Sequence, residues 1–222
     1  MTTITLIGPW QFALPLFCLS LTIFRPQILQ VTAFINVHGQ PESVGSIPAL
    51  VKLHVWLHAA ALTIIVMLSS IEKPFECVVS LLFTLYIFRL NLIDSIAGWL
   101  PREWTWALLA AGLSVAATKG LLLINAGAAI GFLIAGFSIR VVGGYLARRE
   151  VLGLGDIWLT AGLGAWFGFS LALSSLLLAL TGFILWHSSH HQRSLGGPLG
   201  PWLGYSALFS MAVTISDPFL MW

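Results

Sequence analysis

Two aspartates at the edges of long apolar segments are the residues of this sequence with the clearest potential for chemistry. Asp94 ends one apolar segment in FRLNLIDSIAGWLP, and Asp156 begins another in GLGDIWLTAGLG. An acid inside a membrane segment costs about 2.5–3.5 kcal/mol at a helix centre on insertion scales, so each one requires an explanation. Two apolar segments separate the aspartates, so a chain that crosses a membrane at each segment returns both carboxyl groups to the same side.

Two carboxyl groups in a partly dry site could catalyse hydrolysis. When they lie within a few ångströms of each other they cannot both ionise readily, so the pair shares one proton and titrates as a unit. One carboxylate then acts as general base on a water molecule, while the protonated partner donates to a carbonyl oxygen. This is the chemistry of an aspartic protease, and the sequence does not assign which aspartate is the first base.

Each aspartate could instead stabilise the start of a helix. An acid in the first turn accepts hydrogen bonds from backbone N–H groups that have no partner within the helix. Glycines favour a further role for Asp156, because small residues permit unusual dihedrals and close approach of neighbouring helices. Five of them surround it: Gly153, Gly155, Gly162, Gly164 and Gly168. From these residues alone, capping and catalysis both stay open.

The composition indicates a membrane protein. Of the 222 residues, 58% are hydrophobic and 8% are charged, whereas ordinary soluble domains carry about 25% charged residues. The uncharged run 157–192 would make a single helix of about 54 Å against a hydrocarbon core of about 30 Å, so we divide it near Phe169–Ser175. The eight expected helices cover residues 6–24, 53–71, 77–93, 104–118, 120–139, 157–192 in two parts, and 200–216.

The positions of Lys and Arg orient these helices. With residues 25–52 as a short cytoplasmic loop, strict alternation places eight of the ten Lys and Arg residues on the cytoplasmic side, as the positive-inside rule requires. The sequence therefore predicts an all-α polytopic transmembrane helix bundle of about eight spans with a periplasmic N-terminus. It predicts one integral membrane domain, residues 1–222, with its catalytic helices at about 75–192. No secretory signal is expected, because no Lys or Arg precedes the first apolar segment.

Three segments resemble the type IV prepilin peptidases, the GxGD aspartyl proteases of the bacterial inner membrane. They are GLGDIWLTAGLGAWFG, IDSIAGWLPREWTWALLAAGL and LGGPLGPWLGY. The first is similar to the GxGD signature, and the second to the segment around the other aspartate of that family. The matching positions are Gly153, Gly155 and Asp156 in the first segment, Asp94, Leu100, Pro101 and Thr105 in the second, and Pro198, Gly200 and Pro201 in the third.

The resemblance implies a membrane aspartic endopeptidase with Asp94 and Asp156 as its catalytic residues. Such enzymes remove the basic leader peptide from type IV prepilins or pseudopilins at the cytoplasmic face, for pilus assembly or type II secretion. The implied partners are a prepilin substrate and the lipid bilayer, with no nucleic acid, since the net charge of +2 is small and scattered. The alternative is a non-proteolytic protein, such as a proton-coupled carrier that uses the buried aspartates.

The sequence departs from the family pattern at several positions. Many members carry two CxxC pairs in the first loop, which would suit a structural zinc. Residues 25–52 contain no cysteine, so no metal is expected. No cofactor is expected either; S-adenosylmethionine would be needed only if the N-methyltransferase activity of larger relatives is retained, which the reduced loop disfavours. Trp158 stands where the family usually has a lysine, and Arg102 replaces a common second acid.

Other polar residues are weaker candidates for function. His54 and His58 are four residues apart and share a helix face, but no carboxylate or third ligand accompanies them, so a metal site is disfavoured. Glu150, and more weakly Glu42, could meet a basic leader peptide. The sequence does not specify the oligomeric state.

Overall fold

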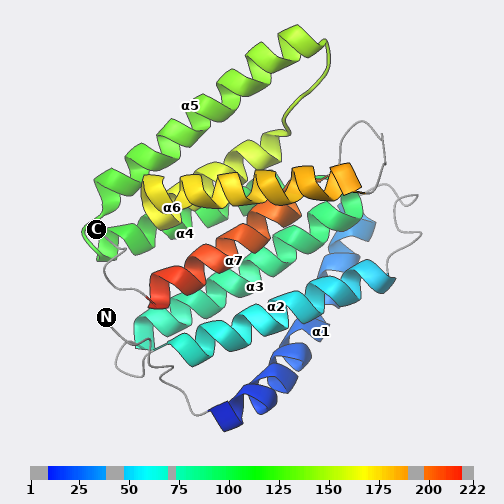
Figure 1. Ribbon diagram of the computed structural model, residues 1–222, viewed down its shortest axis with the longest axis vertical. Helices are drawn as coiled ribbons and strands as arrows, with labels where there is room; N and C mark the ends of the chain where they lie inside the picture. Colours follow the sequence, from blue (N-terminus) through cyan, green and yellow to red (C-terminus); the bar gives the residue numbers. More distant parts are fainter. Residues whose placement is uncertain (1–9, 39–47, 70–73, 190–197, 217–222) are drawn as a thin grey trace. The chain divides into compact units, whose positions relative to one another are not determined.

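The computed structural model describes residues 10–38, 48–69, 74–189 and 198–216. These residues are mostly helical and contain no strand, which confirms the all-α class. A short 3₁₀ turn, Trp10–Phe12, precedes the first helix (Figure 1). The helices are α1 (Ala13–His38), α2 (Pro48–Leu68), α3 (Pro74–Ala97), α4 (Arg102–Thr118), α5 (Leu122–Ala147), α6 (Leu154–Ser189) and α7 (Gly200–Ser216).

The chain divides into two compact units. The first unit contains the chain up to Ala97 and from Leu208 onward, and within it α1, α2 and α3 pack against one another. The second unit runs from Gly98 to Ala207, and within it α6 packs against both α4 and α5. Asp94 therefore belongs to the first unit and Asp156 to the second. The single domain of residues 1–222 stays a prediction.

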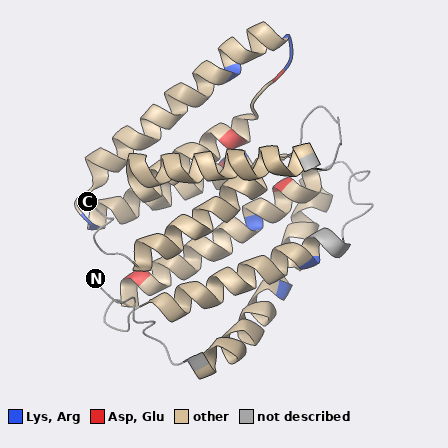
Figure 2. Ribbon diagram, viewed as in Figure 1, with Lys and Arg blue, Asp and Glu red and all other residues tan. Residues whose placement is uncertain are grey.

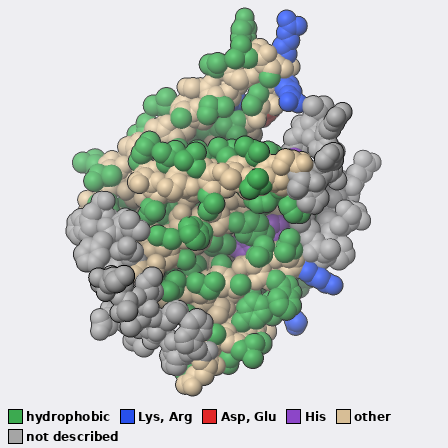
Figure 3. Space-filling model, viewed as in Figure 1, with side chains coloured by type: hydrophobic (Ala, Val, Ile, Leu, Met, Phe, Trp, Pro, Cys, Tyr) green, Lys and Arg blue, Asp and Glu red, His purple; other side chains and the backbone are tan. Residues whose placement is uncertain are grey.

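Many apolar side chains of these helices face outward, and several polar side chains are buried. Leu29 and Leu123 are 73% and 87% exposed, whereas His58 and Asn91 are 0% and 1% exposed. Figure 2 shows that the ribbons carry few charged residues, and Figure 3 shows hydrophobic side chains over much of the visible face. Helices surrounded by lipid have this distribution, because lipid solvates apolar side chains while polar groups must find partners inside the protein.

Five of the described helices are long and apolar enough to cross a bilayer. They are α1, α2, α3, α5 and α6. Helices α4 and α7 have 17 residues each, at the lower end of the roughly 17–25 residues that a span needs. The chain is therefore a multi-pass membrane protein, while eight spans and a periplasmic N-terminus stay predictions.

The first connection is shorter than the sequence predicts. We expected a helix over 6–24 and a loop over 25–52, which is wrong in both boundaries. Helix α1 continues to His38, and α2 begins at Pro48. The residues between them, 39–47, lie outside the described ranges.

Polar side chains in the second half of α1 have partners on α3, which explains the wrong boundary. The Arg89 guanidinium donates from Nε to Gln27 Oε1 at 2.9 Å and from Nη2 to Gln30 Oε1 at 2.7 Å. Gln27 is buried in this arrangement. Residues that resembled the start of a polar loop are thus part of a contact between two helices.

The longest apolar run forms α6, a 36-residue helix whose backbone is non-helical at Gly168, with φ 71° and ψ −174°. This combination of dihedrals is essentially restricted to glycine. The expected division of this run into two helices is confirmed, with the break at Gly168, one residue before the range 169–175 near which we expected it. The helix is regular through its serines, where the Ser174 hydroxyl donates to the Ser170 carbonyl at 3.0 Å. The second half of α6 turns back past the first half (Figure 1).

Replacing Gly168 with alanine is expected to destabilise the second unit by about 1–3 kcal/mol. The new Cβ would be held in a backbone conformation that L residues rarely adopt, and it would lie 3.2 Å from Asn125 Oδ1. Thermal unfolding of the purified protein in detergent measures the effect. Gly131→Ala in α5 is the control, because a Cβ there meets nothing within 4 Å. Equal Tm values for the two variants would contradict the position of the break.

Candidate active site

Asp156 lies in the first turn of α6, where its carboxyl group folds back over the start of the helix. A Cβ on Gly153 would lie 2.9 Å from Asp156 Oδ2, so only glycine leaves room for the carboxyl group. The Ile157 backbone N donates to the Gly153 carbonyl at 3.3 Å, and the Thr160 hydroxyl donates to the Asp156 backbone carbonyl at 2.7 Å. An acid in this position can cap the helix. The capping role that the sequence left open is therefore compatible with the structure.

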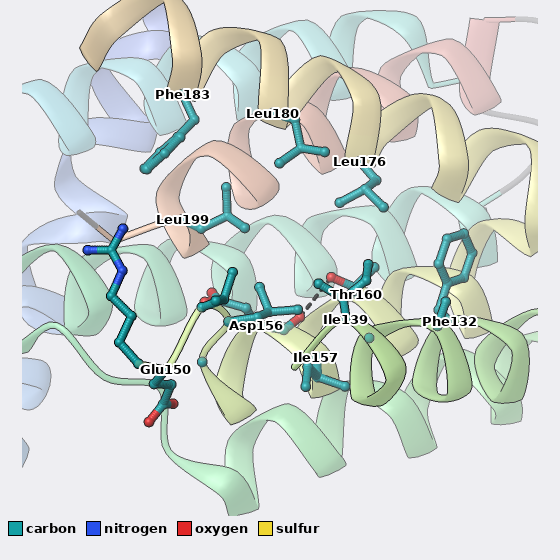
Figure 4. A pocket seen from close by; sticks show the side chains of 16 residues that line it. Phe132, Ile139, Glu150, Asp156, Ile157, Thr160, Leu176, Leu180, Phe183 and Leu199 are labelled. Atoms are coloured by element: carbon teal, nitrogen blue, oxygen red, sulfur yellow. Dashed lines mark hydrogen bonds between the residues drawn. The ribbon is translucent and has the colours of Figure 1, made fainter. Parts of the chain in front are cut away.

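Asp156 also lines a cavity of about 720 Å³ in the second unit. Figure 4 shows Asp156 and Thr160 on the first half of α6, with Leu176, Leu180 and Phe183 reaching toward them from the second half. The remaining walls come from α5, from the connection between α5 and α6, and from the residue before α7. The cavity thus combines the carboxyl groups of Asp156 and Glu150 with mainly apolar walls.

The charged residues near this cavity are partly paired with each other. The Arg140 guanidinium forms an ion pair with Glu150 and also donates to the Leu152 carbonyl. Arg140 was expected just after a helix, but α5 continues past it to Ala147. Glu150, a candidate contact for a basic peptide, is thus already engaged by an arginine. Glu42 lies outside the described residues.

Asp94 lies in the last turn of α3 and is 4% exposed. Two residues of α3 that are close to Asp94 in sequence form hydrogen bonds with polar side chains of α2. Ser95 Oγ lies 2.7 Å from His54 Nε2, and Asn91 Nδ2 lies 3.2 Å from His58 Nε2. His58 Nδ1 lies 2.7 Å from the His54 carbonyl oxygen. A carbonyl only accepts, so His58 Nδ1 carries the hydrogen and Nε2 accepts from the Asn91 amide.

We refer to His54, His58, Asn91 and Ser95 as the α2–α3 polar cluster. Its two members on α3 are the residue three before Asp94 and the residue directly after it. Hydrogen bonds from both residues to α2 fix the turn of α3 that carries Asp94. Interhelical hydrogen bonds of this kind are typical of polar residues buried in membrane helix bundles. Within the described ranges, no three His, Cys, Asp or Glu side chains are arranged to hold a metal ion.

The two aspartates lie in different compact units. Each lies near a helix end, Asp94 at the end of α3 and Asp156 at the start of α6. Asp94 is buried and Asp156 is half-buried. Their pairing in one site stays a prediction from the sequence.

Comparison with protein families identifies the chain. The family model of the type IV leader peptidase family matches residues 78–187, about half of the chain. The chain belongs to the type IV leader peptidase family. The matched range includes both Asp94 and Asp156, together with the Leu100–Pro101 pair.

Curated proteins with leader peptidase names are similar to this chain. A type 4 prepilin-like proteins leader peptide-processing enzyme of Escherichia coli is 34% identical over 109 residues, covering 47% of this chain and 40% of that protein. A prepilin leader peptidase/N-methyltransferase of Aeromonas salmonicida is 30% identical over 159 residues, 68% of this chain and 54% of that protein. This chain thus spans about half the length of these relatives or less. No solved structure matches it.

Two of the segments that resemble the leader peptidase family contact each other in the structure, which gives a packing reason for their residues. Leu100 packs against Gly155, where a Cβ would lie only 2.6 Å from Leu100 Cβ. The Leu-Pro pair therefore supports the turn that carries Asp156. Pro101 is the N-cap residue of α4, and its carbonyl accepts from the backbone N of the buried Thr105 at 3.1 Å.

Helix α7 starts on the third family-like segment, with Pro198, Gly200 and Pro201. The Leu199 carbonyl accepts from the Trp202 backbone N at 3.1 Å, which begins the helix. The Trp202 ring covers Gly182 in the second half of α6, where a Cβ would lie 2.6 Å from Trp202 Cε3. This packing holds Leu199 at the wall of the cavity that Asp156 lines.

Two residues that depart from the leader peptidase pattern, Arg102 and Trp158, both contact Trp106. The Arg102 guanidinium carbon lies 4.2 Å from the centroid of the Trp106 ring, a cation–π geometry. The Trp158 ring lies edge-on to Trp106, with centroids 5.2 Å apart, and also approaches Phe137 at 6.5 Å. Trp158 therefore connects the Asp156 turn to α4 and α5 by aromatic packing, at a position where the family usually has a charge.

Sequence reasoning missed the cavity wall and the partners of the histidine pair. Leu176 and Leu180 line the cavity, but leucines that face a cavity and leucines that face lipid follow the same pattern. The partners of the histidines could have been found. Asn91, Asp94 and Ser95 share one face of a helix through their spacing of three and four residues, which is a signal for a polar contact with another helix.

Gly155→Ala is expected to lower the stability of the second unit by about 1–3 kcal/mol, the usual cost of overpacking a filled contact. The new Cβ would lie 2.6 Å from Leu100 Cβ, an atom fixed to the backbone that cannot rotate away. Loss of helical circular dichroism on heating reports the change. Gly127→Ala in α5 is the matched control, because a Cβ there meets nothing within 4 Å. A Gly155→Ala protein that melts with the control would refute the Leu100–Gly155 contact.

Proposed function

We propose that this chain is a membrane aspartic endopeptidase that removes the basic leader peptide from type IV prepilins or pseudopilins. The observation that carries the proposal is the leader peptidase family match over residues 78–187, a range that includes both aspartates. Relatives named as leader peptidases support it. The structure contributes a half-buried carboxyl group on the wall of a cavity large enough for peptide side chains. These matches do not favour a proton-coupled carrier.

Asp94 and Asp156 supply the chemistry in this proposal. One carboxylate takes a proton from a water molecule, whose oxygen attacks the carbonyl carbon of the scissile peptide. The protonated partner donates to the carbonyl oxygen, which gives a tetrahedral diol. The carboxyl group that took the proton from water then protonates the amide nitrogen, while the other carboxylate takes a proton from a diol hydroxyl. The C–N bond breaks, the acid and amine products leave, and the pair again holds one proton. Water is the only co-reactant, so the reaction needs no cofactor or metal.

The proposed active site faces the cytoplasm from the bacterial inner membrane. The distribution of Lys and Arg supports this orientation, because alternation of the expected spans brings both aspartates to the side that carries most of the positive charge. The substrate is itself anchored by an apolar helix in the same bilayer. Its leader would therefore present the scissile bond near the membrane surface, at the level of the helix ends that carry the aspartates.

Cleavage of a prepilin by the chain tests the proposal. The chain is co-expressed with each prepilin-like protein of its source organism, and gel mobility reports removal of the leader. We expect a shortened product whose new N-terminus, found by mass spectrometry, begins the hydrophobic segment. Full processing by both the Asp94→Ala and the Asp156→Ala variants would disprove the assignment. Ion-coupled transport in proteoliposomes without cleavage of any prepilin would favour the carrier instead.

The same mass measurement tests for methyl transfer. Relatives such as that of Aeromonas salmonicida carry N-methyltransferase in their names. Because residues 25–52 lack the cysteines that many family members have there, we expect a product without an added methyl group. A product heavier by one methyl group, in cells with no other methyltransferase for it, would contradict this expectation and imply S-adenosylmethionine as a cofactor.

A further inference from the structure

The cavity in the second unit has a polar side and an apolar side. Asp156 and Thr160 line it on the first half of α6, and Leu176, Leu180 and Phe183 reach in from the second half (Figure 4). Its volume of about 720 Å³ falls within the roughly 300–1,000 Å³ of pockets that bind ligands. A ligand in the cavity would place its apolar groups against the second half of α6 and its reactive group beside the Asp156 carboxyl group.

The side chains on the second half of α6 separate into two faces. Leu176, Leu180 and Phe183 are spaced by four and three residues, which places them on one face of the helix. Leu177 lies outside the cavity and is 56% exposed, and Ile184 is 62% exposed. Gly168 turns this half of the helix back. The face with Leu176, Leu180 and Phe183 therefore lines the cavity with Asp156, and the opposite face points away from the protein.

The charges around the cavity favour an apolar occupant over a basic peptide. Glu150 is already paired with Arg140, and Arg149 also lines the cavity. Asp156 is thus the only other carboxyl group in the lining, and it is needed for the reaction. An apolar occupant matches the leucine and phenylalanine walls, because burying apolar surface there gains roughly 25 cal/mol per Å².

We propose that this cavity binds apolar side chains of the substrate next to the scissile bond, so that Leu176, Leu180 and Phe183 determine substrate specificity. The inference rests on the proposed peptidase function. A prepilin changes at the cleavage site from a basic leader to a hydrophobic segment, and the cavity takes the hydrophobic side. Binding there would hold the scissile carbonyl beside Asp156, which is the positioning that hydrolysis requires.

A matched pair of variants tests the inference. Leu180→Trp fills the cavity, whereas Leu177→Trp adds the same side chain to the outward face of the same helix. Both are assayed with a prepilin and with a variant prepilin whose large apolar residues after the scissile bond are replaced by alanine. We expect Leu180→Trp to raise KM for the natural prepilin about tenfold or more and to prefer the alanine substrate. Leu177→Trp keeps the wild-type preference.

The outcomes distinguish the cavity from the peptidase function. Wild-type cleavage with identical substrate preferences for Leu180→Trp and Leu177→Trp overturns the cavity inference and leaves the proposed function standing. Absence of wild-type cleavage for every prepilin overturns both. A change in kcat for Leu180→Trp, with KM and preference unchanged, also counts against the inference, because a specificity residue acts through substrate binding.

Photo-cross-linking gives a second measurement that does not depend on activity. Benzoylphenylalanine is introduced at Leu180 or at Leu177 in the Asp156→Asn background, which holds the substrate uncleaved. We expect a cross-link from position 180 to the apolar segment of the prepilin, with little from position 177. Cross-links from position 180 to the basic leader, or to lipid alone, overturn the inference.

Discussion

Asp156→Asn is expected to abolish prepilin cleavage while the protein stays folded. An amide cannot accept a proton from water or deliver one to a leaving group, and general acid–base catalysis contributes about 10²–10⁴-fold to a rate. The capping geometry over Gly153 survives the change, because an amide oxygen still accepts hydrogen bonds at a helix start. Initial cleavage rates of the purified enzyme should therefore fall by at least about a hundredfold, with Tm close to wild type.

Glu103→Gln is the matched control for this substitution. Glu103 lies in the first turn of α4, as Asp156 lies in the first turn of α6, and it is exposed. The control should keep both cleavage rate and Tm. If Asp156→Asn cuts the rate less than tenfold, Asp156 is a capping residue and the peptidase assignment loses one of its two carboxyl groups.

The candidate residues of the site could be chosen from the sequence because membrane segments contain few acids. In a chain with 8% charged residues, an aspartate at the edge of an apolar run is conspicuous, and glycines around Asp156 indicate close packing. The structure confirms the packing, with Gly155 against Leu100 and Gly164 against Phe132, where a Cβ would lie 2.9 Å from the phenylalanine ring. Local patterns carried this information, since each signal lies within a few residues of the aspartate.

Features that depend on distant contacts could not be predicted. Helix α1 continues past residue 25 because Gln27 and Gln30 bond to Arg89, and about sixty residues separate these partners in the sequence. A hydropathy pattern records only that glutamine is polar. The same limit applies to the cavity. The sequence around Leu180 has the pattern of any lipid-facing helix, and only the break at Gly168 brings this half of α6 next to Asp156.

The two departures from the family pattern show why single positions are hard to interpret alone. Trp158 and Arg102 each looked like the loss of a charge that the family usually has. In the structure both contact Trp106: the cation–π contact from Arg102 lies within α4, and the aromatic edge contact with Trp158 joins α4 to the first half of α6. Trp158 thus packs against α4 where the family usually has a lysine, and Arg102 lies over the ring of the same tryptophan, Trp106.

Asp94→Asn is expected to lose cleavage as completely as Asp156→Asn, again by at least about a hundredfold. Asp94 is 4% exposed, and a neutral amide of the same size costs less to bury than a carboxylate, so Tm should not fall. Asn91→Leu is the contrasting variant on the same face of α3. It removes the donor to His58 Nε2, which should cost about 1–3 kcal/mol of stability and reduce cleavage less than tenfold.

This contrast separates catalysis from interhelical packing. If Asp94→Asn instead melts early, as Asn91→Leu should, and still cleaves within tenfold of wild type, Asp94 belongs to the buried polar network of the first unit and not to the chemistry. Glu76→Gln, in the first turn of the same helix, controls for loss of an acid from α3 and should change neither quantity.

The double variant Asp94→Asn/Asp156→Asn tests whether the two carboxyl groups act as a pair. Catalytic residues that work as one unit are strongly non-additive, because removing the first already stops the reaction that the second would serve. We therefore expect the double variant to cleave as slowly as either single variant, within about threefold. Independent roles predict that the two losses multiply, to about 10⁴-fold or more from two hundredfold effects. A multiplied loss would contradict a shared site for aspartates that lie in two different units of the chain.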